Sequence, residues 1–573
     1  MRKINHKVDF CIVGGGMAGL CAAIAAARHG VRVALMHDRP VLGGNASSEI
    51  RMWICGAHGE NNRETGILEE IQLENLYRNP SASYSIWDSI LYEKVRAEKN
   101  IILLLNCSCM EARVENSIIK SVKGWQLTTE TWHTVEADYF GDCSGDSILG
   151  MLSGAEYRIG RESREEFNES IEPEVQDQKT MGMSCLFQIR ETDRPQPFIA
   201  PVWAEKYPTD EDLPHREHDK VTNFWWIELG GEDDSIHDTE ELRDQLLKIV
   251  FGVWDHMKNY GDHGVENWVI DWIGFLPGKR ESRRCIGDYI LNQNDVKAEG
   301  KFEDLVGYGG WSMDDHFPEG FRYKKGYPTI FHEAPSPFGI PYRCLYSKNI
   351  NNLFLAGRNI STTHAALSAT RVMGTCSILG QAIGTAVSIA AAKHLTPREI
   401  YDQEISSLQQ MLMEDDCYLP WHKRIISTLS QKGELTSSSG EPQKLRNGYD
   451  RPIGEEDNGW IASIGEWTEY RFEQEEEISE LRFIFDSELN RRIHNMPCNY
   501  PLVQNDYHIP LTMVKDFRIE ILVQDEWVVV YRKKENYQRL VKIQLKVKAK
   551  AIRVIPECTW GAENAHIYSW DIM

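Results

Sequence analysis

Basic residues are scarce in this sequence. Its 573 residues include 63 Lys and Arg against 86 Asp and Glu, which gives a formal net charge of −23. A surface this acidic repels phosphate backbones and anionic lipid headgroups. The composition therefore argues against nucleic acid and membranes as partners.

Long uninterrupted apolar runs are also missing. The longest helix-like apolar stretch, residues 376–392, is interrupted by Gly380, Gln381, Gly384 and Ser388 and is short for a membrane span. We predict a buried core helix there. Residues 1–10 lack the charged region, long apolar region and cleavage site of a signal peptide, so we expect a cytoplasmic protein.

Cysteines in disulfide or metal-binding spacing are missing too. The 13 cysteines are an odd number, and several, such as Cys11 and Cys21, lie in apolar runs, which predicts reduced core residues. Cys107-Ser108-Cys109 has no second pair. His256 and His263 lack i, i+4 spacing and nearby cysteines, so we predict ordinary loop or strand residues and no metal site. Neither a G-x-S-x-G string nor a Walker-type phosphate loop occurs.

The overall composition is that of a large globular protein. Apolar residues make up 42% and charged residues 26%, and the length allows about three domains. A loop-rich stretch at residues 420–440 predicts a boundary. Beyond it, short apolar or alternating runs are typical of a β-sandwich; they are residues 467–472, 480–485, 517–523, 527–531, 540–547 and 551–555.

The first forty residues predict a strand, a tight turn, a helix and a second strand. Residues 8–13 and 31–36 are apolar, and Gly14 to Gly19 fits G-x-G-x-x-G between them. Such glycines let backbone N–H groups at a helix start approach a pyrophosphate. The unit therefore predicts a doubly wound α/β sheet that binds a dinucleotide. An acidic group should bind the ribose at the end of the second strand, where His37 and Asp38 are both candidates.

A second glycine pair follows that strand directly. Gly43-Gly44-Asn45 would let the chain pass close to a flavin's ribityl chain, and with Gly14 to Gly19 it resembles the glutathione-reductase-like FAD domain. The fuller string from Asp38 to Glu49, DRPVLGGNASSE, resembles the FAD-dependent oxidoreductase family related to the flavoproteins of fumarate reductase and succinate dehydrogenase.

Later segments extend this resemblance over roughly residues 6–420. They are residues 140–146 (FGDCSGD), 154–158 (GAEYR), 280–284 (RESRR), 310–316 (GWSMDDH), 353–361 (LFLAGRNIS) and 368–376 (SATRVMGTC). The resemblance implies that FAD is the cofactor. The residues implied to bind FAD are Gly14, Gly16, Met17, Ala18, Gly19, His37, Asp38, Arg39, Gly43, Gly44, Asn45, Ser48, Cys109, Ser144, Gly145, Gly357, Arg358, Gly374, Thr375 and Cys376.

The helix predicted to begin near Gly374 has a physical consequence for the flavin. Its free N–H groups and positive dipole end would face the flavin N1–C2=O edge and favour electron uptake. Hydride transfer from an alcohol carbon also requires a base, and His titrates near neutral pH. The catalytic candidates are His364, His316, Arg283 and Arg371, and the substrate candidates are His58, Trp311 and Arg343.

The C-terminal part resembles a galactose-binding-like, discoidin-type jelly roll. Residues 435–439, 446–449 and 467–472 and Trp460 carry that resemblance. It implies either glycan binding or a packing or dimerisation role, and both stay open. The expected domains are an FAD-binding fold in two parts (1–160 and 345–425), a mixed α/β substrate or cap region (161–344) and a β-sandwich (435–573).

The expected function is an FAD-dependent oxidoreductase that takes hydride from an alcohol carbon, with a His as base. A small-molecule substrate such as a carbohydrate or polyol is the first expectation, and a homo-oligomer is possible. One alternative is a dehydrogenase or reductase that acts at a carbon–carbon bond of a carboxylate. Another is a carbohydrate-binding protein with a vestigial flavin site. Flavin-dependent tRNA modification disagrees with the charge of −23.

Overall fold

The computed structural model describes residues 1–220, 222–492, 496–497 and 507–573. The chain forms two compact units. The first contains residues 1–57, 82–408 and 496–504, and the second contains residues 58–81, 409–495 and 505–573. This division differs from the expected domains. The predicted cap region belongs to the same unit as the FAD-binding fold, and residues 58–81 leave that fold for the C-terminal unit.

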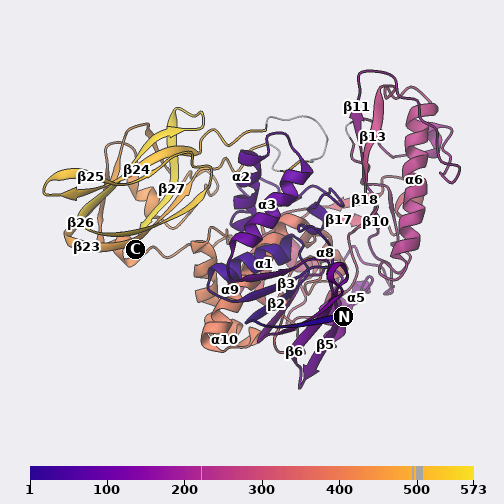
Figure 1. Cartoon of the computed structure of the whole chain (residues 1–573), viewed down its shortest axis with the longest axis horizontal. Coiled ribbons are helices and arrows are strands. Elements are labelled where there is room, and N and C mark those ends of the chain that lie inside the picture. Colours follow the sequence, from indigo (N-terminus) through magenta and orange to yellow (C-terminus); the bar gives the residue numbers. More distant parts are fainter. Residues whose placement is uncertain (221, 493–495, 498–506) are drawn as a thin grey trace. The chain divides into compact units, whose positions relative to one another are not determined.

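The first unit contains the predicted parallel sheet (Figure 1). All four strand pairs are parallel, and every strand except the edge strand β4 is fully buried, which explains the continuously apolar strand sequences. The strand order, β20-β8-β2-β3-β4, reverses direction next to β2, and such a switch point is where open α/β sheets bind ligands. The strands are β2 (Phe10–Val13), β3 (Val33–Met36), β4 (Ile101–Leu104), β8 (Tyr139–Asp142) and β20 (Leu353–Leu355).

Two helices of this unit pack closely through small residues. The first, α1 (Met17–Arg28), follows the first glycine string, and the second, α9 (Met373–Lys393), is the predicted core helix. A Cβ placed on Gly380 of α9 would lie 2.0 Å from the carbonyl oxygen of Ala18 in α1. α9 is long and apolar enough to cross a membrane, but 89% of its most apolar window is buried inside the protein. The prediction of a core helix is therefore confirmed.

The first unit also contains a separate sheet of four strands, with the order β1-β7-β6-β5. A helix, α3, precedes β4 and contacts the second glycine string: Nε1 of Trp87 donates to the carbonyl oxygen of Ala46 at 2.9 Å, and Leu91 lies against Gly43. The cysteines that the structure describes are free thiols, as expected. The elements are β1 (Arg2–Lys7), β5 (Cys107–Glu115), β6 (Ile118–Gln126), β7 (Thr131–Glu136), α3 (Tyr84–Ala97), α4 (Ile148–Ser153) and two short 3-10 turns, η1 (Gly44–Ala46) and η2 (Leu127–Thr129).

The predicted cap region is mixed α/β, as expected. Its core lies against α6 (Thr239–Asn259), whose apolar residues recur every three or four positions and pack on Phe187, Phe224 and Trp226. The other elements of this region are α5 (Arg164–Phe167), β10 (Met183–Ser184), β11 (Phe187–Glu191), η3 (Asp210–Asp212), β12 (Glu228–Leu229), β13 (Trp268–Ile273), β14 (Gly278–Lys279), β15 (Arg284–Cys285), α7 (Gln293–Lys297), β16 (Leu305–Gly309), β17 (Met313–His316), η4 (Gly320–Arg322), β18 (Thr329–His332), β19 (Phe338–Pro341) and η5 (Tyr342–Cys344). Two elements of the FAD-binding parts flank it, β9 (Tyr157–Arg158) and α8 (His364–Thr370).

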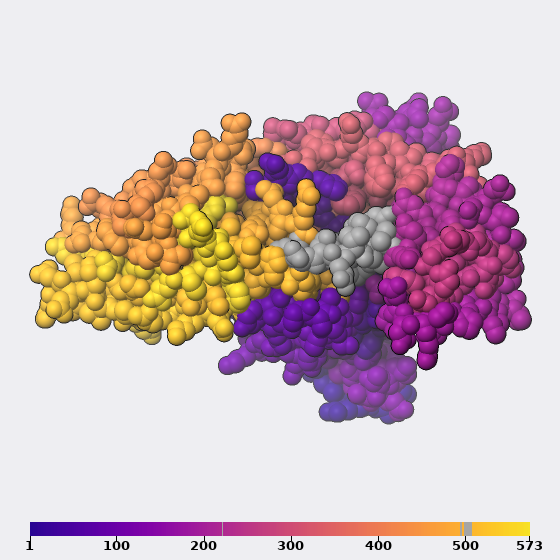
Figure 2. All heavy atoms as spheres, turned by 90° about the horizontal axis from the view of Figure 1, so that it is seen from above, coloured from indigo at the N-terminus to yellow at the C-terminus, as the bar shows by residue number. Residues whose placement is uncertain are grey.

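The second unit is a curled antiparallel sheet of seven strands, whose yellow and orange atoms form one continuous body in Figure 2. Two of its strands are each as long as two predicted runs, and bulges bend them around a common aromatic core. The prediction that the C-terminal part is built from β-strands is confirmed, while its jelly-roll form stays a prediction. The elements are α2 (Ile67–Arg78), α11 (Thr428–Lys432), β21 (Glu434–Ser437), η6 (Pro442–Arg446), β22 (Trp460–Ser463), β23 (Thr468–Phe485), β24 (Val514–Val523), β25 (Glu526–Lys533), β26 (Leu540–Thr559) and β27 (Asn564–Ile572); the chain passes from the first unit to this one within α10 (Pro397–Glu414).

Candidate functional site

The two glycine strings meet at the carboxyl end of the parallel sheet. The N–H of Gly43 donates to the carbonyl oxygen of Gly15 at 2.9 Å, and Gly16 and Gly43 form an isolated parallel bridge. A Cβ on Gly16 would meet only the Cα of Gly44, at 3.8 Å. The absence of side chains therefore leaves an open backbone cradle at the start of α1, where Met17 to Gly19 form the first turn.

A positive charge lies beside this cradle. The Nη2 of Arg39 would be 3.7 Å from a Cβ on Gly44. Its Nη1 lies 3.6 Å from the Glu49 carboxylate and, among the described residues, makes no hydrogen bond although it is buried. A guanidinium at a helix N-terminus suits a pyrophosphate, which accepts hydrogen bonds from both.

The structure distinguishes the two predicted ribose ligands. Nδ1 of His37 accepts a hydrogen bond from the N–H of Gly15 at 3.0 Å, so Nε2 donates to the carbonyl oxygen of Val41 at 3.0 Å. Burial, together with Arg39, lowers the pKa of His37 to about 4, so the ring is neutral. Both ring nitrogens are thus occupied, whereas the Asp38 side chain is 63% exposed. This geometry favours Asp38 as the ribose ligand.

The turns after β8 and β20 bring further predicted residues to the same edge. The buried carboxylate of Asp142, at the end of β8, accepts from the N–H and hydroxyl of Ser144 at 3.0 and 2.6 Å. Gly145 has a φ of 77° and lies against the guanidinium of Arg358, the residue after Gly357. Arg358 in turn donates to Asp146 at 2.7 Å.

Three predicted FAD ligands, Asn45, Ser48 and Cys109, have bonds or surroundings that limit how they could contact FAD. The side chain of Asn45 donates to the carbonyl oxygen of Lys279 at 3.2 Å, and the N–H of Ser48 donates to Asp88 at 3.1 Å. Cys109 lies in β5, and burial raises its thiol pKa to about 12. The backbone of Cys109 stays a predicted FAD ligand.

The start of α9 differs from the prediction in one detail. The helix begins at Met373, and the N–H of Gly374 donates to the carbonyl oxygen of Cys55 at 2.8 Å, so that N–H does not point freely toward a ligand. The N–H of Gly374 is therefore not one of the free N–H groups predicted at this helix start, and the position of Gly374 near the flavin stays a prediction. The hydroxyl of Thr375 is buried and, within the described part of the chain, has no partner. Arg371 and Arg358 both lie close enough to Cys376 to favour its thiolate electrostatically, although burial raises its pKa to about 12.

A buried charge network adjoins Arg371. We define the β17 network as His316, His364, Arg280 and Arg371 with the carboxylates of Glu228, Glu281, Asp314 and Asp315. Nη2 of Arg371 donates to Asp314 at 3.1 Å, and Asp314 lies 3.3 Å from Nε2 of His316. Nδ1 of His316 lies 2.7 Å from Glu228, which also pairs with Arg280 at 3.5 Å. Arg371, Arg280 and His316 therefore each have a carboxylate partner in this network, and Glu281 also lies 3.7 Å from the buried Arg284.

His364 has the same type of surroundings as His316. Its Nδ1 lies 2.9 Å from Glu281 and its Nε2 lies 3.2 Å from Asp315. Burial by itself lowers the pKa of His364, but the two carboxylates outweigh burial and raise it well above its usual value. The carboxylates of Glu228 and Asp314 likewise raise the pKa of His316 against burial. Because carboxylates face both nitrogens of each ring and raise both pKa values, they favour the protonated rings, and the predicted histidine base is not supported.

Sequence reasoning missed Glu172. Residues 163–180 are polar, which predicts a loop or lid edge, yet the structure buries Glu169 and Glu172 there. Both carboxyl oxygens of Glu172 are buried and, among the described residues, unpartnered. Burial, opposed by nearby His364, raises the pKa of Glu172 to about 7. Two glutamates in a segment with few apolar residues give no sequence signal for burial.

Comparison with known proteins decides the family. A model of the family described as FAD dependent oxidoreductase matches residues 9–412, most of the chain. The chain belongs to the FAD-dependent oxidoreductase family. The enzyme class and the FAD cofactor predicted from the glycine strings are thereby confirmed. The finer kinship with fumarate reductase and the glutathione-reductase-like form of the fold stay predictions.

Some solved structures with similarity to this FAD-dependent oxidoreductase match about a quarter of it. The family 32 carbohydrate-binding module from Streptococcus pneumoniae EndoD is 15% identical, with a TM-score of 0.20, and the match covers 25% of this chain and 97% of the module. The family 32 module from C. perfringens NanJ, solved in complex with galactose, is 9% identical, with a TM-score of 0.18 and coverage of 25% and 93%. No curated protein matches the chain.

The residues present fit an FAD molecule. Buried polar atoms without a hydrogen-bond partner in the described part of the chain gather around the cradle and the start of α9, and FAD carries phosphate, hydroxyl and carbonyl groups to bind them. Besides Thr375, they belong to arginines: Nη1 of Arg39 and Nε of Arg358 and of Arg371. FAD would therefore lie between the glycine cradle and α9 in this oxidoreductase.

The remaining catalytic and substrate candidates differ in where they lie and what they contact. Asp304 holds the guanidinium of Arg343 at 2.9 and 3.0 Å, so we assign Arg343 to structure and not to substrate. Arg283 donates to the carbonyl oxygen of Asp146 at 3.3 Å, close to Arg358. Trp311 is half-buried between β16 and β17, and His58 is exposed and belongs to the second unit.

Proposed function

We propose that this FAD-dependent oxidoreductase oxidises an alcohol carbon of a neutral polyhydroxylated compound, with carbohydrates and polyols as the substrate class. The observation that carries the proposal is the pairing of both arginines of the β17 network with carboxylates. Arg371 lies 3.1 Å from Asp314, and Arg280 lies 3.5 Å from Glu228. A dicarboxylate would have to compete with these carboxylates for the arginines, whereas paired carboxylates and imidazole groups can accept from and donate to hydroxyl groups.

Aromatic surface beside the network supports the same substrate class. The ring of Trp225 lies 5.7 Å from that of His316 and 6.5 Å from that of Tyr327. Flat aromatic faces next to hydrogen-bonding groups suit a ligand with apolar C–H faces and polar hydroxyl edges.

The reaction requires a hydride acceptor and a proton acceptor. FAD, when bound, supplies the hydride acceptor at N5. The substrate carbon loses a hydride and its hydroxyl loses a proton, which leaves a carbonyl group. We assign the proton to a carboxylate near His364, because Glu281 and Asp315 raise the pKa of His364 and favour its protonated form. Glu172, with a pKa of about 7 and unbonded oxygens, is our candidate for the group that holds the proton.

An anaerobic titration tests this function. Neutral sugars, polyols and dicarboxylates such as succinate are added separately to the flavin-loaded protein, and the absorbance of oxidised flavin is followed. The proposal predicts bleaching by a neutral polyhydroxylated compound and none by succinate. The network variant Asp315→Asn should bleach at least about 10-fold more slowly, while Asp271→Asn, an exposed carboxylate paired with Arg190, serves as the matched control.

The other outcomes separate the alternatives. Bleaching by dicarboxylates alone would support a carbon–carbon dehydrogenase and overturn the proposed substrate class. Sugar binding without any flavin response would support a carbohydrate-binding protein with a vestigial flavin site. A sugar ligand for the C-terminal sheet stays a prediction that the same panel tests with the flavin-free protein.

A further inference from the structure

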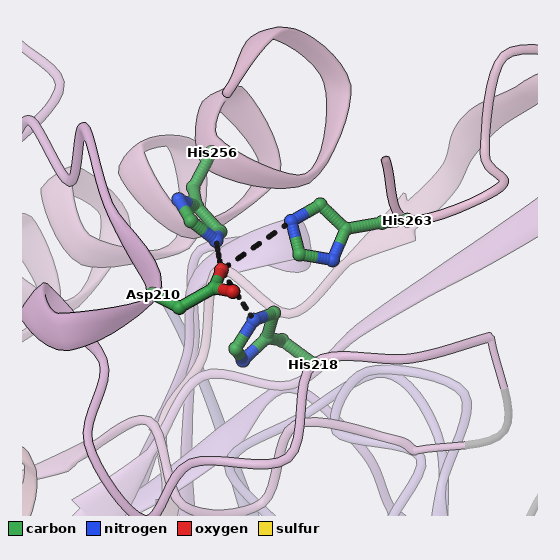
Figure 3. Close-up of side chains that lie close together, drawn as sticks. All are labelled: Asp210, His218, His256 and His263. Carbon is green, nitrogen blue, oxygen red and sulfur yellow. Dashed lines mark hydrogen bonds and ion pairs between the residues drawn. The ribbon is translucent and has the colours of Figure 1, made fainter. Parts of the chain in front are cut away.

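Four metal-ligating side chains converge in the cap region, apart from the β17 network (Figure 3). We call them the Asp210 cluster: Asp210, His218, His256 and His263. Asp210 opens the 3-10 turn η3, and His256 lies in the last turn of α6. His218 and His263 come from loops on either side of α6. The proposed oxidoreductase reaction uses none of these residues.

The three rings point at one carboxylate oxygen. Oδ1 of Asp210 lies 3.0 Å from Nε2 of His256, 3.6 Å from Nε2 of His218 and 3.8 Å from Nε2 of His263. All four ligand atoms lie within 4.8 Å of one another. Ligand atoms about 2.1 Å from a tetrahedral Zn²⁺ are about 3.4 Å from one another, so the four atoms need only small shifts to surround one ion.

Hydrogen bonds to the backbone fix the orientation of two rings. Nδ1 of His256 lies 2.7 Å from the carbonyl oxygen of Tyr207, and Nδ1 of His218 lies 2.6 Å from that of Arg216. A carbonyl oxygen only accepts, so each Nδ1 must carry the hydrogen. In the neutral ring, Nε2 then presents a lone pair to the carboxylate of Asp210. Backbone carbonyls orient metal-binding histidines in the same way.

The three rings are also close to one another, with centroids 4.8 to 5.0 Å apart. Three imidazole nitrogens that converge on one carboxylate oxygen form a set of donor atoms for a single cation. His263 also has a buried Nε2 with no hydrogen-bond partner in the described part of the chain. A single divalent ion satisfies all of these atoms at once.

The ligand set selects the ion. Ca²⁺ and Mg²⁺ prefer oxygen ligands, whereas three imidazoles and one carboxylate suit a borderline-soft ion in tetrahedral geometry. Four protein ligands close the coordination sphere, as in structural sites. We propose that the Asp210 cluster is a structural Zn²⁺ site. The Asp210 side chain is 75% exposed, which gives the ion a path of entry from solvent.

The position of the cluster indicates what the ion stabilises. Tyr207 and Leu213 on one side, and Trp254 and Val265 on the other, belong to the apolar core of the cap region. Zn²⁺ would fasten the segment around Asp210 to the end of α6 and to the loop that follows. Binding to the folded form alone stabilises it by mass action.

Metal analysis of the purified, full-length protein tests the proposal. About one Zn²⁺ per chain is expected by elemental analysis, as for any single occupied site. The protein is then stripped with a chelator and titrated with Co²⁺, whose visible absorption distinguishes tetrahedral from octahedral coordination. An intense tetrahedral spectrum that Zn²⁺ abolishes, and a higher unfolding temperature with Zn²⁺, are expected.

Variants make the test specific to the cluster. His263→Ala and Asp210→Asn should each weaken Zn²⁺ binding at least about 100-fold, since each removes or neutralises one of four ligands. His237→Ala is the matched control, because His237 is exposed and lies outside the cluster. Near-ultraviolet circular dichroism verifies that each variant folds. Octahedral Co²⁺ spectra, or equal Zn²⁺ affinity in the wild type and in folded cluster variants, would overturn the proposal.

Discussion

The N–H of Gly43 donates a hydrogen bond to the carbonyl oxygen of Gly15 at 2.9 Å. This bond joins the two glycine strings, one after β2 and the other after β3, into a single backbone cradle. Since backbone groups hold the strings together, the cradle forms without the cofactor. We therefore expect that substitutions in the two glycine strings can change FAD affinity without changing the stability of the fold.

Arg39→Gln tests the positive charge of the cradle. Loss of one charge-assisted hydrogen bond to a pyrophosphate costs about 1.5–3 kcal/mol, so FAD affinity should fall by about 10- to 100-fold. Arg32→Gln is the control, because Arg32 is exposed and pairs with Asp9 away from the cradle. Affinity is measured by fluorescence quenching of added FAD. Equal losses in both variants would mean that Arg39 has no special role.

Gly380→Ala tests the close contact of α9 with α1. A Cβ there would lie 2.0 Å from the carbonyl oxygen of Ala18, and overpacking of this kind costs about 1–3 kcal/mol of unfolding free energy. Ser388→Ala on the same helix is the control, because the Ser388 hydroxyl bonds only within α9, to Thr385. Urea denaturation measures both. A neutral effect of Gly380→Ala would show that the helices are not in close contact.

The sequence predicted the parts of the fold in which local pattern and buried surface agree. The residues from Val13 to Gly19 combine an apolar strand, glycines and a small-residue helix, and all three elements are present. The pattern could not show that residues 58–81 join the C-terminal unit, since that depends on contacts distant in sequence. One such contact is the buried ion pair between Glu69 and Arg491, with distances of 2.6 and 2.7 Å.

The candidate site was also predictable only in part, because its ion pairs join residues that are distant in the sequence. Motif positions located Arg358 and Arg371, but not their carboxylate partners. The charge on His364 is set by Glu281 and Asp315, which approach from two other elements. The spacing of His256 and His263 gave no sign of the proposed metal site, because one residue lies on a helix and the other on the loop beyond it.

Glu172→Gln tests the buried carboxyl group. Its folded-state pKa of about 7 lies above the unfolded value near 4.5, so the folded state binds more protons between these values and stability falls as pH rises through that window. Relative to the wild type, Glu172→Gln should be more stable at pH 8, by about 2–3 kcal/mol, and little changed near pH 4.5. Glu174→Gln, an exposed neighbour, should have no such effect.

The same variant tests the proposed proton acceptor. If Glu172 holds the proton, the rate of flavin bleaching in the wild type rises through neutral pH, and Glu172→Gln removes this limb and slows the reaction by at least about 100-fold. A variant that gains stability at high pH yet keeps the wild-type pH profile would leave Glu172 buried but uninvolved in the chemistry.

His566 makes the second unit sensitive to alkaline pH. Its nitrogens lie 2.9 Å from Asp457 and 3.1 Å from Asp486, and these carboxylates outweigh burial and raise the pKa of His566 to about 9. The unfolded value is near 6.5, so the stabilisation is complete below that pH and is lost as pH rises through about 9. His566→Gln should cost up to about 3 kcal/mol at pH 6 and little above pH 10. A cost that does not change with pH would contradict the charged pair.

The most direct test of the flavin cradle compares two glycine variants after titration with FAD. A Cβ fits at Gly16, where only the Cα of Gly44 lies nearby at 3.8 Å, whereas at Gly19 it would lie 1.9 Å from the carbonyl oxygen of Gly14. The account predicts that wild-type protein releases FAD on denaturation, that Gly16→Ala folds with wild-type stability but retains little FAD, and that Gly19→Ala is destabilised. Folded wild-type protein that binds no FAD, or a Gly16→Ala variant that binds it as tightly as the wild type, would contradict the account.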